Sequence, residues 1–153
     1  MYRIRYWAVE HAGALSKIYH CLEWLLLKMA PLLTRIGFDR LEAPVFAFER
    51  RVKGLLLDSQ SCGQCIVGST GMSCPMNCPK SLRNGPCGGV RQNGKCEILS
   101  DMTCVWVLAW QGNQQMASDT YPIQVVQMPV DYRLKGTSAW LREVRLKLGR
   151  VSS

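Results

Sequence analysis

Seven of the eight cysteines of this 153-residue chain lie between positions 62 and 104, and this cluster constrains the fold more than any other feature. Their spacing is Cys62-x2-Cys65-x8-Cys74-x3-Cys78-x8-Cys87-x8-Cys96-x7-Cys104. More than half of the 13 glycines lie in the same stretch, so long helices or strands are not expected there. Such a segment needs something other than an apolar core to hold it together, and bound metal is the usual solution.

Disulfides account poorly for these cysteines. Their number in the cluster is odd, and Glu10 and His11 interrupt the apolar run that a signal peptide would need after Arg3 and Arg5. The apolar stretch Trp24–Leu27 is cut by Lys28 and Pro31 and is far shorter than the roughly 18–20 residues of a membrane span. We therefore expect a cytoplasmic protein without a membrane span, where cysteines are usually metal ligands or catalytic groups.

Thiolates hold both iron–sulfur clusters and structural zinc, and the local pattern favours clusters. Gly63 and the Gly85–Gly89 run let the backbone approach a cluster closely enough to donate N–H bonds to its sulfur. Cys74 and Cys78 are each followed by proline, as at the end of bacterial ferredoxin runs. Zinc is the alternative, although a zinc ribbon usually has two Cys-x2-Cys pairs and this chain has one.

Composition divides the chain into three segments. Residues 1–57 are predicted to be a helical segment, residues 58–110 a cysteine-rich metal-binding domain, and residues 111–153 an extended segment (Tyr121–Pro129) followed by a basic tail. The expected fold is thus a small α-rich protein stapled by metal. Its N-terminal helices lead into a loop-rich cysteine domain with little regular structure.

Apolar periodicity predicts three helices and the faces that they bury. The first should end at Pro31 and bury Leu15, Ile18, Leu22, Leu25 and Met29. The second should begin at Pro44 and bury Phe48, Val52, Leu55 and Leu56. The third should span about Ser138–Leu148 and bury Trp140, Val144 and Leu148.

Some residues outside the cysteine cluster also need an interpretation. Cys21 is expected to be a small core residue, and His11 and His20 ordinary helix residues rather than ligands. Lys80 and Arg83 are either surface charges or cations beside an anionic cluster.

Large apolar residues near the cysteines have two explanations. Trp106 and Trp110, four residues apart, should share a helix face and either shield a cluster or pack against the N-terminal helices. The nearby methionines should be apolar fillers; they are Met72, Met76 and Met102.

The net charge of +8 is concentrated toward the C-terminus. From Asp131 onward the basic residues are Arg133, Lys135, Arg142, Arg145, Lys147 and Arg150. This pattern fits either an acidic partner or a solvated amphipathic tail. Aromatic residues do not alternate with the basic ones as they do in single-strand binders, so we expect no nucleic-acid partner.

The cysteine blocks occur in a recognisable order. They are Ser61–Cys65, Ser69–Lys80, Asn84–Gly89, Gly94–Glu97 and Cys104–Trp106. In this order they resemble the methylenetetrahydrofolate reductase C-terminal-like family, and the resemblance extends from about Gly54 to Arg150. Members of that family occur as a small subunit, or as an appended domain, beside a flavin-containing reductase barrel.

The resemblance implies an accessory role. The seven clustered cysteines would hold iron–sulfur clusters, [4Fe–4S] by preference, that pass electrons to the FAD of a separate methylenetetrahydrofolate reductase subunit in a hetero-oligomer. The alternative is a structural zinc module that assembles the reductase without electron transfer. The sequence shows no catalytic constellation, and 153 residues cannot include a barrel of about 250 residues, so catalysis is assigned to the partner.

One position departs from the family pattern. The family has a cysteine where this chain has Ser59, so an eight-ligand set becomes seven. Ser59, Asp58 or Cys21 could supply the missing ligand, or the cluster could be a three-iron form. The second cluster could also be lost and leave a structural zinc. We expect interleaved ligand sets, because each short cysteine pair must be closed by more distant ligands.

Overall fold

The structure, a computed structural model, describes residues 2–116 and 122–151. Its helices are α1 (Tyr2–Glu10), α2 (Ala12–Lys28), α3 (Ala30–Ile36), α4 (Phe38–Leu57), α5 (Val105–Gln115) and α6 (Ala139–Val151), with 3-10 turns η1 (Pro75–Asn77) and η2 (Tyr132–Leu134). Within the described ranges there is no β-strand, and Lys95 and Thr103 form an isolated bridge. The expected α-rich fold, with a cysteine region of little regular structure, is confirmed.

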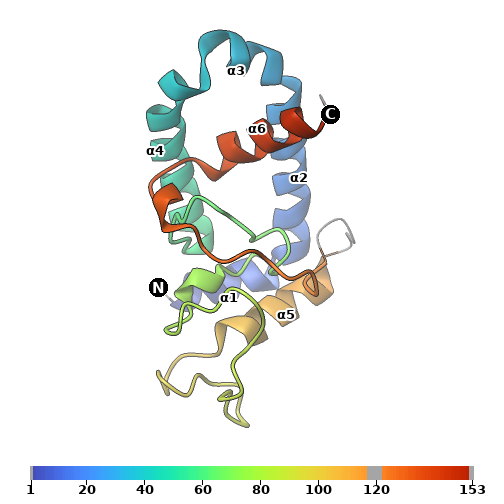
Figure 1. The fold of residues 1–153 in the computed structure, drawn as a ribbon. Coiled ribbons are helices and arrows are strands. Elements are labelled where there is room, and N and C mark those ends of the chain that lie inside the picture. The colour runs from blue at the N-terminus through green and yellow to red at the C-terminus, as the bar shows by residue number, and fades with distance from the viewer. Residues whose placement is uncertain (1, 117–121, 152–153) are drawn as a thin grey trace.

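The helices form an arch (Figure 1). Helices α2 and α4 are its sides, α3 joins them at the top, and α6 lies between them in contact with both. Helices α1 and α5 lie together at the open end. The loop after α4 crosses the arch below α6, whereas the loops between η1 and α5 extend beyond the open end. The two halves of the cysteine segment therefore lie in different surroundings.

The boundaries of the first helices agree only in part with prediction. Helix α2 ends at Lys28, and Pro31 lies in the first turn of α3, where a missing N–H is tolerated. The predicted helix start at Pro44 is wrong, because α4 begins at Phe38 after Gly37, whose φ is +97°. Pro44 lies inside α4 on its exposed side.

The predicted buried faces of α2 and α4 are also partly wrong. On α2, Ile18, Leu25 and Met29 are exposed, while Ala12 and Ser16 are buried. Of the predicted buried face of α4, Phe48, Leu55 and Leu56 are exposed. The inward face of α4 instead carries Glu49 and Lys53, which are 5% and 4% exposed. Hydrophobic periodicity assigns such charged residues to solvent. The buried face predicted for α4 is therefore turned around the helix axis from the observed one.

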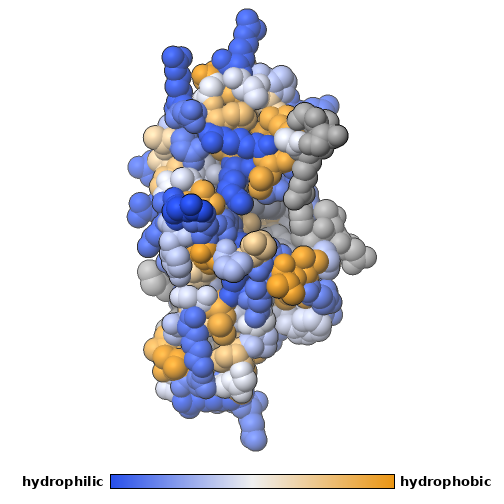
Figure 2. Space-filling view, viewed as in Figure 1, coloured by the Kyte–Doolittle hydropathy of each residue, from blue (hydrophilic) through white to orange (hydrophobic). Residues whose placement is uncertain are grey.

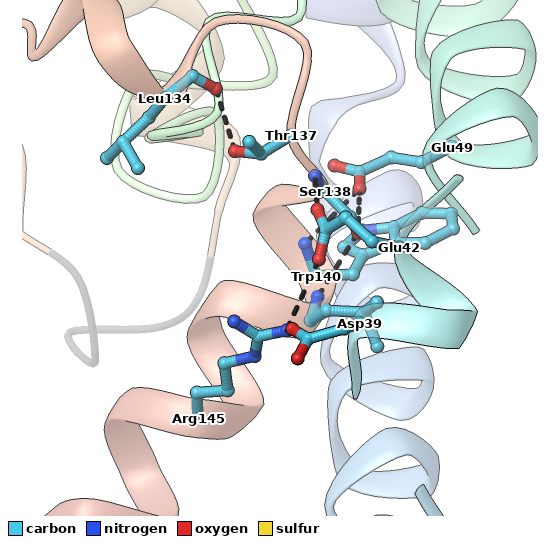
Figure 3. Close-up of polar contacts among 9 residues, drawn as sticks. Asp39, Glu42, Glu49, Leu134, Thr137, Ser138, Trp140 and Arg145 are labelled. Carbon is cyan, nitrogen blue, oxygen red and sulfur yellow. Dashed lines mark hydrogen bonds and ion pairs between the residues drawn. The ribbon is translucent and has the colours of Figure 1, made fainter. Parts of the chain in front are cut away.

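Helix α6 matches its prediction. Trp140 and Val144 are buried, and Leu148 packs against a core of Ala30, Leu33 and Leu141. Ser138 caps the helix by accepting from Leu141 N at 3.2 Å and donates to Glu49 Oε2 at 2.6 Å (Figure 3).

Acidic residues of α4 also bind the first turn of α6. The N–H of Ser138 donates to Glu42, and the N–H of Trp140 donates to Glu49 at 3.3 Å. A helix N-terminus favours negative charge, so these carboxylates fix α6 across the arch.

The basic tail is therefore part of the fold. Arg145 pairs with Asp39 of α4 at 3.2 Å, and Lys147 pairs with Glu23 of α2. At the other end of the chain, Arg5 pairs with Asp58, the residue that caps α4, at 2.6 Å. These ion pairs fasten α1 and α6 to the two long helices.

The third segment differs from its expected outline at one end. Residues 111–115 continue helix α5, which runs across the boundary placed after Trp110. Residues 126–131 form neither helix nor strand, which is compatible with the predicted extended segment. Tyr121, the predicted first residue of that segment, lies outside the described residues. None of the helices in the described ranges has the length and apolar character needed to cross a membrane.

Candidate metal centres

The seven clustered cysteines line two separate small cavities. The first cavity, of about 20 Å³, is lined by Cys62, Cys65 and Cys74 together with Ser59. The second cavity, of about 10 Å³, is lined by Cys78, Cys87, Cys96 and Cys104. All seven are free thiols. The two lining sets are consecutive in sequence and not interleaved, and the η1 turn, Pro75–Asn77, lies between Cys74 and Cys78. The interleaving of metal-ligand sets stays a prediction.

Close backbone packing places the first cysteine loop within the arch. Gly71 has a φ of +56°, and a Cβ there would overlap Ala109 O and lie 2.6 Å from the carbonyl carbon of Gly112 in α5. Gly63, between the first two cysteines, has a φ of +75° and packs in the same way against the carbonyl of Leu134. Glycine at these positions lets the loop contact α5 and the segment before α6 directly.

Cys74 is the most buried thiol of the first cavity. It is 5% exposed and packs with Met72, Val67 and Leu57. Burial raises the pKa of Cys74 to about 11, although backbone N–H groups of Gln60 and Met76 hydrogen-bond to its sulfur and oppose the shift. A metal bound here must displace a proton, while the same N–H groups are already directed at the sulfur.

A buried lysine also lines the first cavity. Lys53 Nζ donates to Glu49 at 2.6 Å and lies 5.5 Å from the ring centre of Tyr19 and 5.1 Å from that of Trp140. Burial alone would lower the pKa of Lys53, but the negative charges of Cys65, Tyr19 and Glu49 outweigh it, so the pKa is raised. Lys53 is therefore a charged ammonium group, paired with Glu49, in the lining of the first cavity.

Arg83 is the second buried cation of the first cavity. It is 8% exposed, and its Nη2 donates to the carbonyl of Gln64 at 2.7 Å. Its Nε and Nη1 are shut off from solvent and have no hydrogen-bond partner among the described residues. Of the two alternatives for Arg83, a surface charge is excluded, whereas Lys80 is partly exposed and pairs with Glu97.

The second cavity is built from loops and the start of α5. The N–H groups of Cys96 and Cys104 donate to Met102 O and Gly94 O, both at 2.9 Å, and close the loop that carries these two cysteines. Cys104 is also the N-cap residue of α5, so the positive end of that helix dipole lies at this cavity.

The remaining walls of the second cavity are mixed. Met102 and Trp106 are buried and apolar. Glu97, paired with Lys80, also lines this cavity, and the thiol of Cys87 donates to its carboxylate at 3.7 Å.

A third and larger cavity, of about 360 Å³, lies between α2 and α6. Its walls include apolar residues of both helices, such as Leu26 and Val144. Cys65 and Arg83 line this cavity as well as the first one. Gln64, Ile66 and Ala139 are likewise shared, so the first cavity and the larger one are neighbours.

The thiols of each set surround a space and do not converge on a point. In the described ranges, no three side chains of His, Cys, Asp or Glu are placed to hold one metal ion. Tetrahedral zinc with bonds of about 2.3 Å would need sulfur atoms about 3.8 Å apart. Thiolates are donors for zinc and for iron–sulfur clusters alike, and cavities of about 20 and 10 Å³ are small for a cubane.

Several single-residue expectations are settled by the structure. Cys21 is exposed on α2, so its prediction as a core residue is wrong. Ser59 lines the first cavity, whereas Asp58 pairs with Arg5. The methionines do pack around the cysteines, as expected: Met72 and Met76 with Cys74, and Met102 with Cys96.

The aromatic and histidine expectations are settled too. Trp106 is buried against Cys104, while Trp110 is 52% exposed and shields neither cavity. His11 stacks on Trp7 at the surface, and His20 lies near Glu23. Lys53 was missed by sequence reasoning; the Glu49–Lys53 spacing of four residues on one helix face was the available signal.

A comparison with protein-family models places the chain in a known family. The model of the family described as methylene-tetrahydrofolate reductase C terminal matches residues 38–133. The chain belongs to this family. The match starts at the first residue of α4, earlier than the expected Gly54, and stops before α6, so it includes all seven cysteines, Lys53 and Arg83. Searches of curated proteins and of solved structures give no match.

Proposed function

We propose that this chain is an accessory, metal-bearing subunit of a methylenetetrahydrofolate reductase. Its cysteines would hold iron–sulfur clusters, [4Fe–4S] by preference, and the catalytic FAD would belong to a separate subunit. The observation that carries the proposal is the division of seven thiols between two cavities in a member of the reductase C-terminal family. When bound, such clusters supply one-electron transfer to a neighbouring flavin.

The residues divide into two ligand sets under this proposal. Cys78, Cys87, Cys96 and Cys104 form a complete four-thiolate set. The first cavity has three cysteine ligands, with Ser59 at the fourth position. Backbone N–H groups toward Cys74 and the α5 N-terminus at Cys104 stabilise thiolate charge in each set.

The small volumes of the cavities favour a second candidate. Spaces of about 20 and 10 Å³ suit single ions, which would make the chain a zinc module that stabilises or assembles the reductase. In that case electrons would reach the flavin by another route.

Metal and sulfide analysis of anaerobically purified protein separates these candidates. Iron with acid-labile sulfide and a broad absorption band supports the electron-transfer subunit; zinc without sulfide supports the structural module. About four iron atoms per chain would mean that only the four-cysteine set is loaded, and seven or eight that both are loaded.

The substitution Ser59→Cys tests the ligand assignment directly. We expect it to raise the iron content from about four to about eight atoms per chain, because it completes the thiolate set of the first cavity. Ser61→Cys, at the same cavity but outside the family position, is the matched control and should leave the iron content unchanged. Equal gains from both substitutions would contradict the role given to position 59.

The proposed partner has surface on which to dock. Helices α2 and α4 expose large apolar side chains, including Ile18, Trp24, Phe48 and Leu55 at 56–72% exposure. On the face seen in Figure 2, apolar patches interrupt a largely hydrophilic surface. Exposed apolar residues of this kind are typical of subunit interfaces.

Co-expression tests the association. The chain and a flavin reductase from the same genome should elute as one complex in gel filtration at micromolar concentration. Ile18→Glu should weaken this complex, while the control Lys17→Glu on the same exposed stretch of α2 should affect it less. Separate elution of the wild-type chains would count against the partner.

A further inference from the structure

The first cavity carries a positive charge that the described chain does not neutralise. Lys53 and Glu49 form an ion pair and cancel. Arg83 is also buried, at 8% exposure, yet it donates to an uncharged carbonyl and has two nitrogens without a partner in the described ranges. Burying a cation without a counter-charge is among the most costly arrangements in a protein interior. Such a group indicates that an anion belongs nearby.

The thiols of the same cavity supply that anion once they bind metal. A divalent ion or a doubly charged cluster core with three thiolates has a net charge of −1, and a fourth anionic ligand makes it −2. Cys65 lines the first cavity together with Lys53 and Arg83, and Cys65 and Arg83 also both line the larger cavity.

The second cavity provides the contrast. Its cation, Lys80, is partly exposed and already paired with Glu97. Among the described residues that line it, the buried nitrogen without a partner is the uncharged indole Nε1 of Trp106, and no buried cation lacks a partner. The excess charge is therefore specific to the cavity that lacks a fourth cysteine.

We propose that Arg83 is the counter-charge of the anionic metal–thiolate centre at Cys62, Cys65 and Cys74, and that it destabilises this cavity until the centre forms. This inference rests on the proposed metal-binding function. Arg83 acts here as a positioning residue: its unpaired nitrogens donate to the thiolate sulfurs and fix the charge of the site. The ion pair between Lys53 and Glu49 stabilises another part of the lining of this cavity.

The test is Arg83→Gln, measured in the metal-free and in the metal-loaded protein. Glutamine keeps a donor for the Gln64 carbonyl but removes the charge. In the metal-free protein we expect the unfolding temperature to be unchanged or raised by about 2–4 °C. In the metal-loaded protein we expect the substitution to lower the unfolding temperature. We also expect a chelator to remove metal in two kinetic phases, and the phase that belongs to the first cavity to become about tenfold faster.

Two further variants keep the result interpretable. Arg83→Lys retains the charge, so its metal loss to the chelator should be nearly as slow as that of the wild-type protein. Lys80→Gln, at the second cavity, is the matched control and should leave that phase unchanged. Equal destabilisation of both states by Arg83→Gln would overturn the inference and make Arg83 a structural residue.

The measurements distinguish a failure of the proposed function from a failure of this inference. If the wild-type protein binds neither iron nor zinc, the function and the counter-charge role fall together. If it binds metal but Arg83→Gln shows no opposite effect in the two states, the function stands and the role of Arg83 is rejected.

Discussion

The two cysteine cavities differ in what surrounds their thiols. The first lies inside the helical arch and has three thiols, Ser59 and two buried cations. The second lies in loops beyond the open end of the arch and has four thiols and an ion pair at its edge. The difference shows that one cysteine motif can produce two electrostatic environments, because the helices bring charge to one half and not to the other.

The largest expected effect is the difference in the free energy of unfolding between substitutions of Lys53 at the first cavity and of Lys80 at the second. Lys53→Met should lower the free energy of unfolding by about 3–5 kcal/mol, because it leaves the carboxylate of Glu49 buried without its partner. Lys80→Met, which removes a partly exposed lysine from the second cavity, should cost less than about 1 kcal/mol. Urea titrations of both variants measure this difference. Equal losses would mean that the environments of the two cavities are not distinct.

The second prediction tests how each cysteine loop is packed. Gly71→Ala should cost about 3 kcal/mol, because its φ is positive and the new Cβ would overlap the backbone of α5. Gly88→Ala, beside Cys87, has open space around the Cβ and should cost no more than about 0.5 kcal/mol. Thermal unfolding of the two variants checks the contrast. A tolerated Gly71→Ala would show that the first loop does not rest on α5.

The smallest predicted effect concerns pH. In the metal-free protein the pKa of Cys74 is raised from 9.0 to about 11, so the folded state binds more protons than the unfolded state between these values. The free energy of unfolding should therefore fall as pH rises from about 9 to 11, by about 2–3 kcal/mol.

Cys74→Ala provides the control for this pH effect. Its unfolding free energy should vary less over the same range, as denaturant titrations at several pH values would show. The same slope in both proteins would assign the pH dependence to other groups.

The sequence was sufficient for the parts of the fold that follow hydrophobic periodicity and cysteine spacing. Helix α6 buries Trp140 and Val144 as predicted, and the cysteine region has little regular structure. The faces of α2 and α4 could not be derived in this way, because the inward face of α4 carries Glu49 and Lys53. Their burial depends on Ser138 and Trp140, about 90 residues later in the chain.

The candidate site was predictable as a list of residues but not as a geometry. Spacing alone did not show that the cysteines divide consecutively, since the separation depends on the η1 turn and on where each loop meets α5. The position of Arg83 was also beyond sequence reasoning. Its isolation inside the cavity depends on the three-dimensional path of the loops on both sides of it.

The walls of the two cavities come from different stretches of the chain, and this fixes an order of assembly during synthesis. Every residue that lines the second cavity has been translated once Trp106 is added. The first cavity also needs Thr137 and Ala139, next to the serine that Glu49 binds. A nascent chain thus completes the second cavity first. The first cavity closes only when α6 begins to emerge, so premature termination before Thr137 would leave a protein in which only the second cavity has all of its lining residues.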